Sequence, residues 1–221
     1  MNWSVSMVIL GGVVMLNNAS GQVVTFGPVT LPKALVIGEP FSARFSERRR
    51  VGNGSEALIF DVSGRVYRDS RGRERRETEV KMPAGEGFTL IAITDFGTGE
   101  IYALDPRTHT AVLERIALAS RDEPDAAGRA GPEAGVMPDI PYETVEGLRC
   151  RTFESDFGRP PTVIHVKVWF SDELGQVVRE EATGGNMASS WRLSEIRRLE
   201  PDSALFSVPE GYTVRSGSAH P

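Results

Sequence analysis

The chain has 221 residues, of which 40% are hydrophobic and 25% charged, and its formal net charge is −5. This composition is typical of a soluble globular domain and excludes a disordered or fibrous chain. The acidic balance gives no field that attracts nucleic acid or an anionic membrane, so nucleic acid is not predicted as a partner. The one cysteine, Cys150, leaves no intramolecular disulfide.

Residues 1–21 have the pattern of a signal peptide. The apolar run of residues 5–16 is followed by Ala19, Ser20 and Gly21, which places small residues where a signal peptidase cleaves. The segment before the run has no Lys or Arg, and a buried N-terminal strand or helix is the alternative. The run is too short for a stable membrane span, so no transmembrane segment is expected in the mature chain. We therefore predict a periplasmic or secreted protein.

Along the chain, residues 41–48 predict the first strand, with Phe41 and Phe45 on one face. Residues 51–57 superficially resemble a glycine-rich phosphate loop, but arginines precede them and a strand follows, which favours a hairpin turn. Residues 64–80 predict two polar strands around a turn at residues 69–72. Mixed Arg and Glu on the second of these favours ion pairs on a solvated face over a basic patch for nucleic acid.

Residues 88–94 form the most apolar predicted strand, and residues 100–104 and 110–116 continue it as a meander. Residues 120–141 are rich in Ala, Gly, Pro, Asp and Glu, which predicts a flexible surface loop. Beyond this loop, residues 142–153 resume the sheet.

The stretch from residue 162 to residue 198 predicts three consecutive strands joined by short turns, followed by a short helix at residues 201–206. These elements predict a mainly β fold: a curved antiparallel sheet that forms an incomplete, half-open β-barrel with one or two short helices. We expect one β-rich domain at residues 22–215 and a disordered tail at residues 216–221.

Short motifs stand at residues 66–73, 93–95, 102–106, 146–148, 168–171, 192–196 and 200–209. Together they resemble a group of uncharacterised exported bacterial proteins that is common in Acidobacteria. The pattern of strands is, more remotely, similar to the LolA-like lipoprotein-carrier superfamily, through a Trp-Phe-Ser strand and a closing Pro-Asp-Ser-Ala-Leu-Phe-Ser-Val-Pro. The resemblance implies a half-barrel whose concave side holds an apolar guest, with a hydrophobic ligand, a lipoprotein or an envelope protein as partner.

No residue set predicts catalysis, a cofactor or a metal site. The histidines His109, His165 and His220 have none of the spacings that gather a metal ion. No Gly-x-Ser-x-Gly motif is present, so a hydrolase that uses His109 or His165 is the least favoured hypothesis. Cys150 is flanked by two arginines, but alternation directs these to the opposite face, which favours an inert thiol over a reactive one.

The predicted function is that of a non-enzymatic module that holds a lipid, an acyl chain or a hydrophobic polypeptide segment against the concave face. An envelope protein that senses or regulates by binding another protein is the alternative. Alternation selects the candidate lining residues, and a shift of one residue would move all of them to the other face. They are Phe88, Leu90, Ile101, Ala103, Ile164, Val166, Val168 and Phe170.

Overall fold

The structure is a computed structural model that divides into two units, residues 1–36 and residues 37–221. In the first unit it describes only the antiparallel backbone pair of β1 (Ile9–Leu10) and β2 (Val13–Val14). In the second unit it describes residues 39–54, 57–81, 87–115, 140–160 and 163–217. Most of the predicted signal peptide, nearly all of the predicted loop and the end of the tail lie outside the described residues, so these remain predictions.

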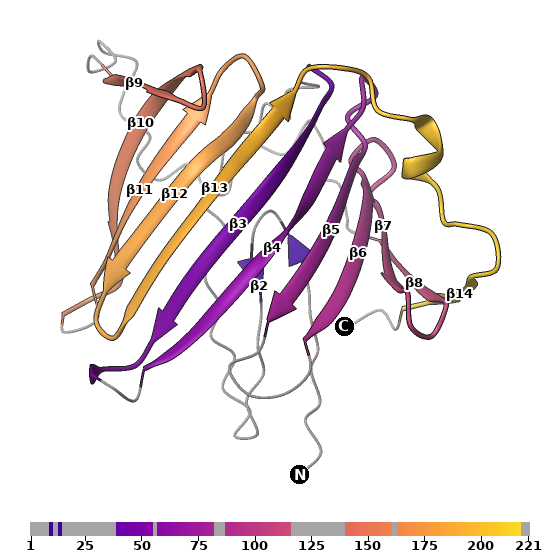
Figure 1. Cartoon of the computed structure of the whole chain (residues 1–221), viewed down its shortest axis with the longest axis horizontal. Coiled ribbons are helices and arrows are strands. Elements are labelled where there is room, and N and C mark those ends of the chain that lie inside the picture. The colour runs from indigo at the N-terminus through magenta and orange to yellow at the C-terminus, as the bar shows by residue number, and fades with distance from the viewer. Residues whose placement is uncertain are drawn as a thin grey trace, which may run out of the picture. The chain divides into compact units, whose positions relative to one another are not determined.

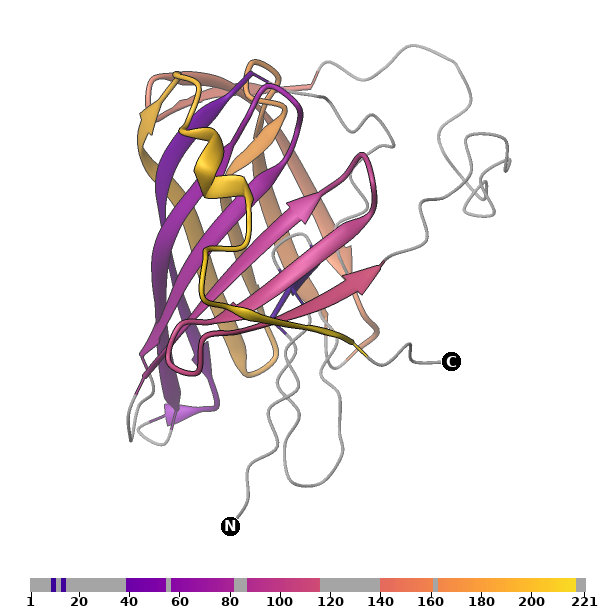
Figure 2. The same cartoon turned by 90° about the vertical axis from the view of Figure 1, so that its right-hand side faces the viewer.

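The second unit is a sheet of twelve strands that is curved and open (Figures 1 and 2). The order across the sheet is β14-β8-β7-β6-β5-β4-β3-β13-β12-β11-β10-β9, so β14 and β9 are its two edges. The predicted fold class, a curved, half-open and mainly antiparallel sheet, is confirmed. The strands are β3 (Phe41–Val51), β4 (Leu58–Arg68), β5 (Glu74–Lys81), β6 (Phe88–Asp95), β7 (Glu100–Asp105), β8 (Thr110–Arg115), β9 (Tyr142–Val145), β10 (Leu148–Phe157), β11 (Ile164–Ser171), β12 (Gln176–Gly184), β13 (Met187–Arg197) and β14 (Thr213–Ser216).

Two features of the sheet have no counterpart in the sequence prediction. Residues 142–153, predicted only to resume the sheet, contain the hairpin of β9 and β10, which turns at Glu146 and Gly147, both with positive φ. The last strand, β14, pairs with β8 in parallel, whereas every other neighbouring pair of the sheet is antiparallel.

The turn between β4 and β5 is organised by Asp69, which is almost completely buried. Its carboxylate accepts hydrogen bonds from the backbone N–H groups of Arg71 and Arg73, at 3.0 and 2.8 Å, and forms an ion pair with the Arg73 guanidinium. An Asp side chain that binds the backbone a few residues ahead stabilises a tight turn. The predicted hairpin at residues 69–72 forms for this reason.

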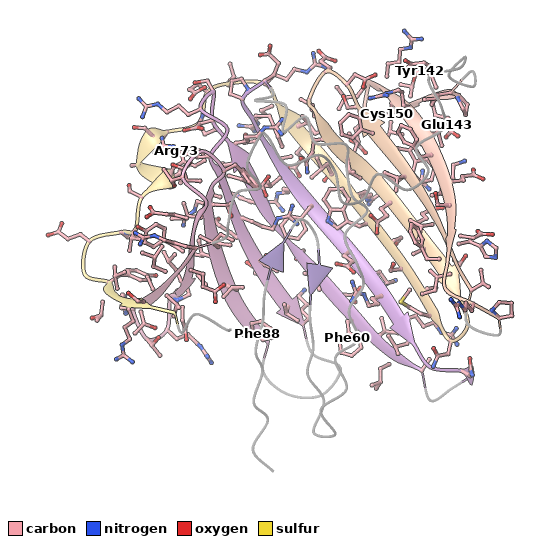
Figure 3. All side chains as sticks on the ribbon, turned by 180° about the vertical axis from the view of Figure 1, so that it is seen from behind. Phe60, Arg73, Phe88, Tyr142, Glu143 and Cys150 are labelled. Atoms are coloured by element: carbon pink, nitrogen blue, oxygen red, sulfur yellow. The ribbon has the colours of Figure 1, made fainter. Side chains whose placement is uncertain are left out.

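The register divides the side chains of the sheet between two faces. We define the inner face by alternate residues of β3, beginning with Phe41, and by the residues that pair with them across the sheet. This face is the concave one, which lies toward the back in Figure 1 and toward the viewer in Figure 3. The remaining residues of the strands form the outer, convex face.

The chain after β13 covers the outer face of β5 to β8. The short helix η2 (Ser203–Phe206) is capped by Asp202, whose side chain accepts a hydrogen bond from the backbone N–H of Ala204 at 2.9 Å. Arg75 of β5 donates a hydrogen bond to the carbonyl of Leu205 at 3.1 Å. A second core on this face holds Ile93, Leu104 and Ala111, against which Val208 and Tyr212 pack. The predicted short helix is confirmed, and it lies on the convex side.

Burial along the inner face decreases from one end of β3 to the other. Phe41, Ala43 and Phe45 are buried, whereas Glu47, Arg49 and Val51 are only partly buried. We call the cross-strand rows through the first three residues the closed half of the inner face, and the rows through the last three the open half.

The closed half is packed by the protein's own side chains. Phe41, Val66 and Leu193 are fully buried. Arg68 of β4 donates a hydrogen bond to the carbonyl of Leu174, in the turn between β11 and β12, so this turn reaches across the inner face over β13 and β3. Leu174 is itself fully buried in the same core. The centre of the closed half is therefore filled by the protein's own side chains.

Candidate ligand-binding face

The register places all eight predicted lining residues on the inner face. Phe88, for example, lies in the same cross-strand row as Glu47 of β3. Phe88 pairs with Val80, Val80 pairs with Val62, and Val62 pairs with Glu47. From the other flank, Val168 is connected to the same Glu47 through Glu180 and Trp191. The period-two pattern thus gives these residues one face, and their role in binding stays a prediction.

Only four of the eight belong to the open half. Leu90, Ile101 and Ala103 lie in rows of the closed half. Phe170 lies two residues past Val168, beyond the Glu47 row on the side of the closed half. The remaining four line the open half from its two flanks, and three of them are partly exposed. These four are Phe88 on one flank and Ile164, Val166 and Val168 on the other.

Further apolar residues of the open half escaped the sequence analysis. Phe60 is partly buried, and Leu58 is 52% exposed; they pair with Arg49 and Val51 of β3. At the other flank, Phe153 and Phe157 of β10 are 39% and 45% exposed. Figure 3 shows Phe60 and Phe88 toward one end of the sheet, away from Arg73 and Cys150 at the other end. The strand alternation of residues 58–60 could have identified Phe60.

Three charged side chains lie at the border between the two halves. Glu47 and Arg49 of β3 form an ion pair with 2.5 Å between Oε1 and Nη2, and their side chains are only 10% and 16% exposed. Glu180 of β12 lies in the same cross-strand row as Glu47, with Trp191 between them. Burial raises the pKa of Glu180, the neighbouring Glu47 raises it further, and Arg49 lowers it. Sequence analysis missed this group because charged residues in a strand pattern normally indicate the solvated face.

No family model matches the chain, and no curated protein matches it.

Several solved structures resemble the sheet. An uncharacterised conserved protein from Thermus thermophilus aligns with a TM-score of 0.43 at 12% identity, over 81% of this chain and 91% of that one. LprF from Mycobacterium bovis aligns at 0.38 and 13% identity, over 80% and 91%. A LolA superfamily protein from Nitrosomonas europaea aligns at 0.36 and 10% identity, over 76% and 90%. All three TM-scores are below 0.5.

The residues considered for hydrolysis lie far apart. His109 follows β7 and His165 lies in β11, and six strands separate β7 from β11 in the sheet order. His109 is exposed and packs edge-on against Tyr212, with 5.4 Å between the ring centroids. His165 pairs with Asp156 on the outer face, with 2.5 Å from Nδ1 to Oδ1. The two imidazoles therefore do not share one site.

The outer face near β9 uses its polar groups in mutual contacts. Trp169 donates a hydrogen bond from Nε1 to Glu143 at 2.8 Å, and the Arg179 guanidinium lies 4.6 Å from the centre of its ring. The hydrogen bonds from Trp169 and then from Lys167 hold the pKa of Glu143 below its ordinary value. Trp169 is thus a packed residue of the outer face, whereas Trp191 is partly exposed on the inner face.

Cys150 is completely buried, and this burial raises the pKa of its thiol. A thiol with a raised pKa is a poor nucleophile, in agreement with the inert thiol that alternation predicts. Within the described ranges, no group of three or more His, Cys, Asp or Glu residues is arranged to hold a metal ion. No helix in this part of the chain is long and apolar enough to cross a membrane.

Proposed function

We propose that the protein is an exported, non-enzymatic binding module that holds the acyl chain of a lipid against the open half of its inner face. The observation that supports this most strongly is the set of apolar side chains that stay partly or well exposed there. They belong to strands from both flanks of a concave surface, and they are Leu58, Phe60, Phe88, Phe153, Phe157, Ile164 and Val166. Exposed apolar surface that is gathered in this way marks a binding site more often than single exposed residues do.

An acyl chain fits this surface better than a polypeptide segment. A polypeptide brings backbone N–H and C=O groups, each of which needs a hydrogen-bond partner once it is removed from water. The backbone groups of the interior strands are already used in the ladder. An acyl chain has no polar group along its length, and each buried CH₂ group contributes about 0.8 kcal/mol.

Native mass spectrometry of the protein purified from a periplasmic extract tests the proposal. We expect the wild type to retain a lipid and the Phe60→Ser variant to lose most of it. Removing an aromatic side chain from a contact with an acyl chain costs about 1.5–3 kcal/mol, which corresponds to roughly tenfold or more in affinity.

The Ile59→Ser variant is the matched control. Ile59 is 47% exposed and pairs with Arg50 on the outer face, one residue from Phe60 on the same strand. This variant should retain the lipid. A wild-type protein with no bound lipid that instead co-purifies with a protein would favour an envelope interaction protein and overturn the proposal.

A further inference from the structure

The inner face of the open half has an unbalanced charge. Its rows run from Glu47 through Val51, and among their described residues only Glu47, Arg49 and Glu180 are charged. β13 contributes Met187, Ser189 and Trp191 to these rows, and the positions from β4, β5, β6, β10 and β11 are likewise uncharged. Two carboxylates therefore face one guanidinium.

The ion pair within this group does not include Glu180. The Arg49 guanidinium forms an ion pair with Glu47. Glu180 forms no hydrogen bond or ion pair with the described residues, although much of its side chain is shielded from water and its row neighbours are Trp191 and Val168. Placing a carboxylate in such surroundings without a partner costs free energy, which a donor that binds to it would recover.

The position of Glu180 relative to the apolar residues indicates which kind of ligand would bring a hydrogen-bond donor to its carboxylate. The neighbouring strand β11 carries Val166 and Val168 on the inner face. The next strand, β10, carries the exposed rings of Phe153 and Phe157 on the same face. A ligand whose chain lies along these residues would bring one end to the Glu180 carboxylate. On the other side of Glu180 begins the closed half, where Val178 and Leu193 are fully buried.

We infer that the ligand is an amphiphile with a cationic ammonium head group, which binds Glu180 while its alkyl chain lies on the open half. This inference rests on the proposed function and adds the class of the head group. An ammonium group supplies both the missing positive charge and the hydrogen-bond donors. A carboxylate head would add a third negative charge beside Glu47 and Glu180.

Binding of three alkyl compounds of equal chain length tests the inference. We expect dodecylamine, in its ammonium form, to bind the wild type about tenfold or more tightly than dodecanol, because a hydrogen bond to a charged group contributes about 1.5–3 kcal/mol. Dodecanoate should bind most weakly. Calorimetric titration below the micellar concentrations measures all three affinities.

The Glu180→Gln variant should lose the preference for dodecylamine and keep the wild-type affinity for dodecanol. Glu181→Gln is the matched control, since Glu181 is the next residue of β12 but lies on the outer face and pairs with Arg179. It should bind all three compounds as the wild type does. Tightest binding of dodecanoate, or an ammonium preference that survives Glu180→Gln, would overturn the inference.

Unfolding measurements separate loss of binding from loss of structure. Above the ordinary pKa of a glutamate, the unfolded chain releases the Glu180 proton more readily than the folded chain, so stability falls as the pH rises through the raised pKa. Gln carries no charge and removes this cost, so Glu180→Gln should be at least as stable as the wild type at neutral pH.

If none of the three compounds binds the wild type, the proposed function fails together with the inference. If dodecanol binds and dodecylamine binds no better, only the inference fails.

Discussion

Replacing Phe41 with alanine should destabilise the protein by about 3–5 kcal/mol. The Phe41 ring is completely buried in the closed half of the inner face. The guanidinium of Arg68 lies 4.8 Å from the centre of the ring. The substitution leaves a cavity. It also removes the ring contact of Arg68, a residue that is only 5% exposed. Urea unfolding followed by tryptophan fluorescence measures the change.

The same substitution at Phe157 is the control. Phe157 also lies on the inner face, but in the open half, where it is 45% exposed. Because little packing is lost there, Phe157→Ala should cost about 1 kcal/mol or less. Equal losses at the two positions would contradict the division of the face into a packed half and an open half.

Replacing Gly64 with alanine should be comparably severe, with a loss of about 3 kcal/mol or more. A Cβ atom at Gly64 would lie 1.8 Å from the backbone oxygen of Glu77 and 2.8 Å from a ring carbon of Phe45. The Glu77 carbonyl belongs to the neighbouring strand β5, so it cannot move away without disturbing the pairing of β4 with β5. The midpoint of urea unfolding measures this loss.

Gly97 provides the comparison for Gly64. It lies in the turn between β6 and β7, where an added Cβ would meet only the flexible side chain of Asp95, at 3.1 Å. Gly97→Ala should therefore change the stability by no more than about 0.5 kcal/mol. If both variants unfold at the same urea concentration, the close approach of β5 to Gly64 is wrong.

Alternation along the strands was sufficient to predict the sheet and the face on which the candidate residues lie. It worked because neighbouring residues of a strand point to opposite faces, so that Phe88 and Leu90 share a side. It could not reveal which part of that face is filled. That depends on Leu174, which a turn brings over β13 and β3, and on the buried Arg68 that binds this turn.

Two other features depend on contacts between segments far apart in the chain. The cluster of Glu47 and Glu180 arises because β3 and β12 each pair with β13, although the two glutamates are 133 positions apart in the sequence. The parallel pairing of β14 with β8 follows from the path of the C-terminal segment over the outer face. Residues 213–216 are all exposed and show no alternation that would indicate a strand.

The central claim, that an acyl chain lies on the open half of the inner face, is tested most directly by fluorescence quenching with a bromine-labelled alkyl chain. Trp191 lies on that face and Trp169 on the outer one. Two variants, each with a single tryptophan, report the faces separately: Phe replaces Trp3 and Trp169 in one, and Trp3 and Trp191 in the other. We predict that the labelled chain quenches Trp191 and leaves the emission of Trp169 largely unchanged. Equal quenching of both, or stronger quenching of Trp169, would contradict the account.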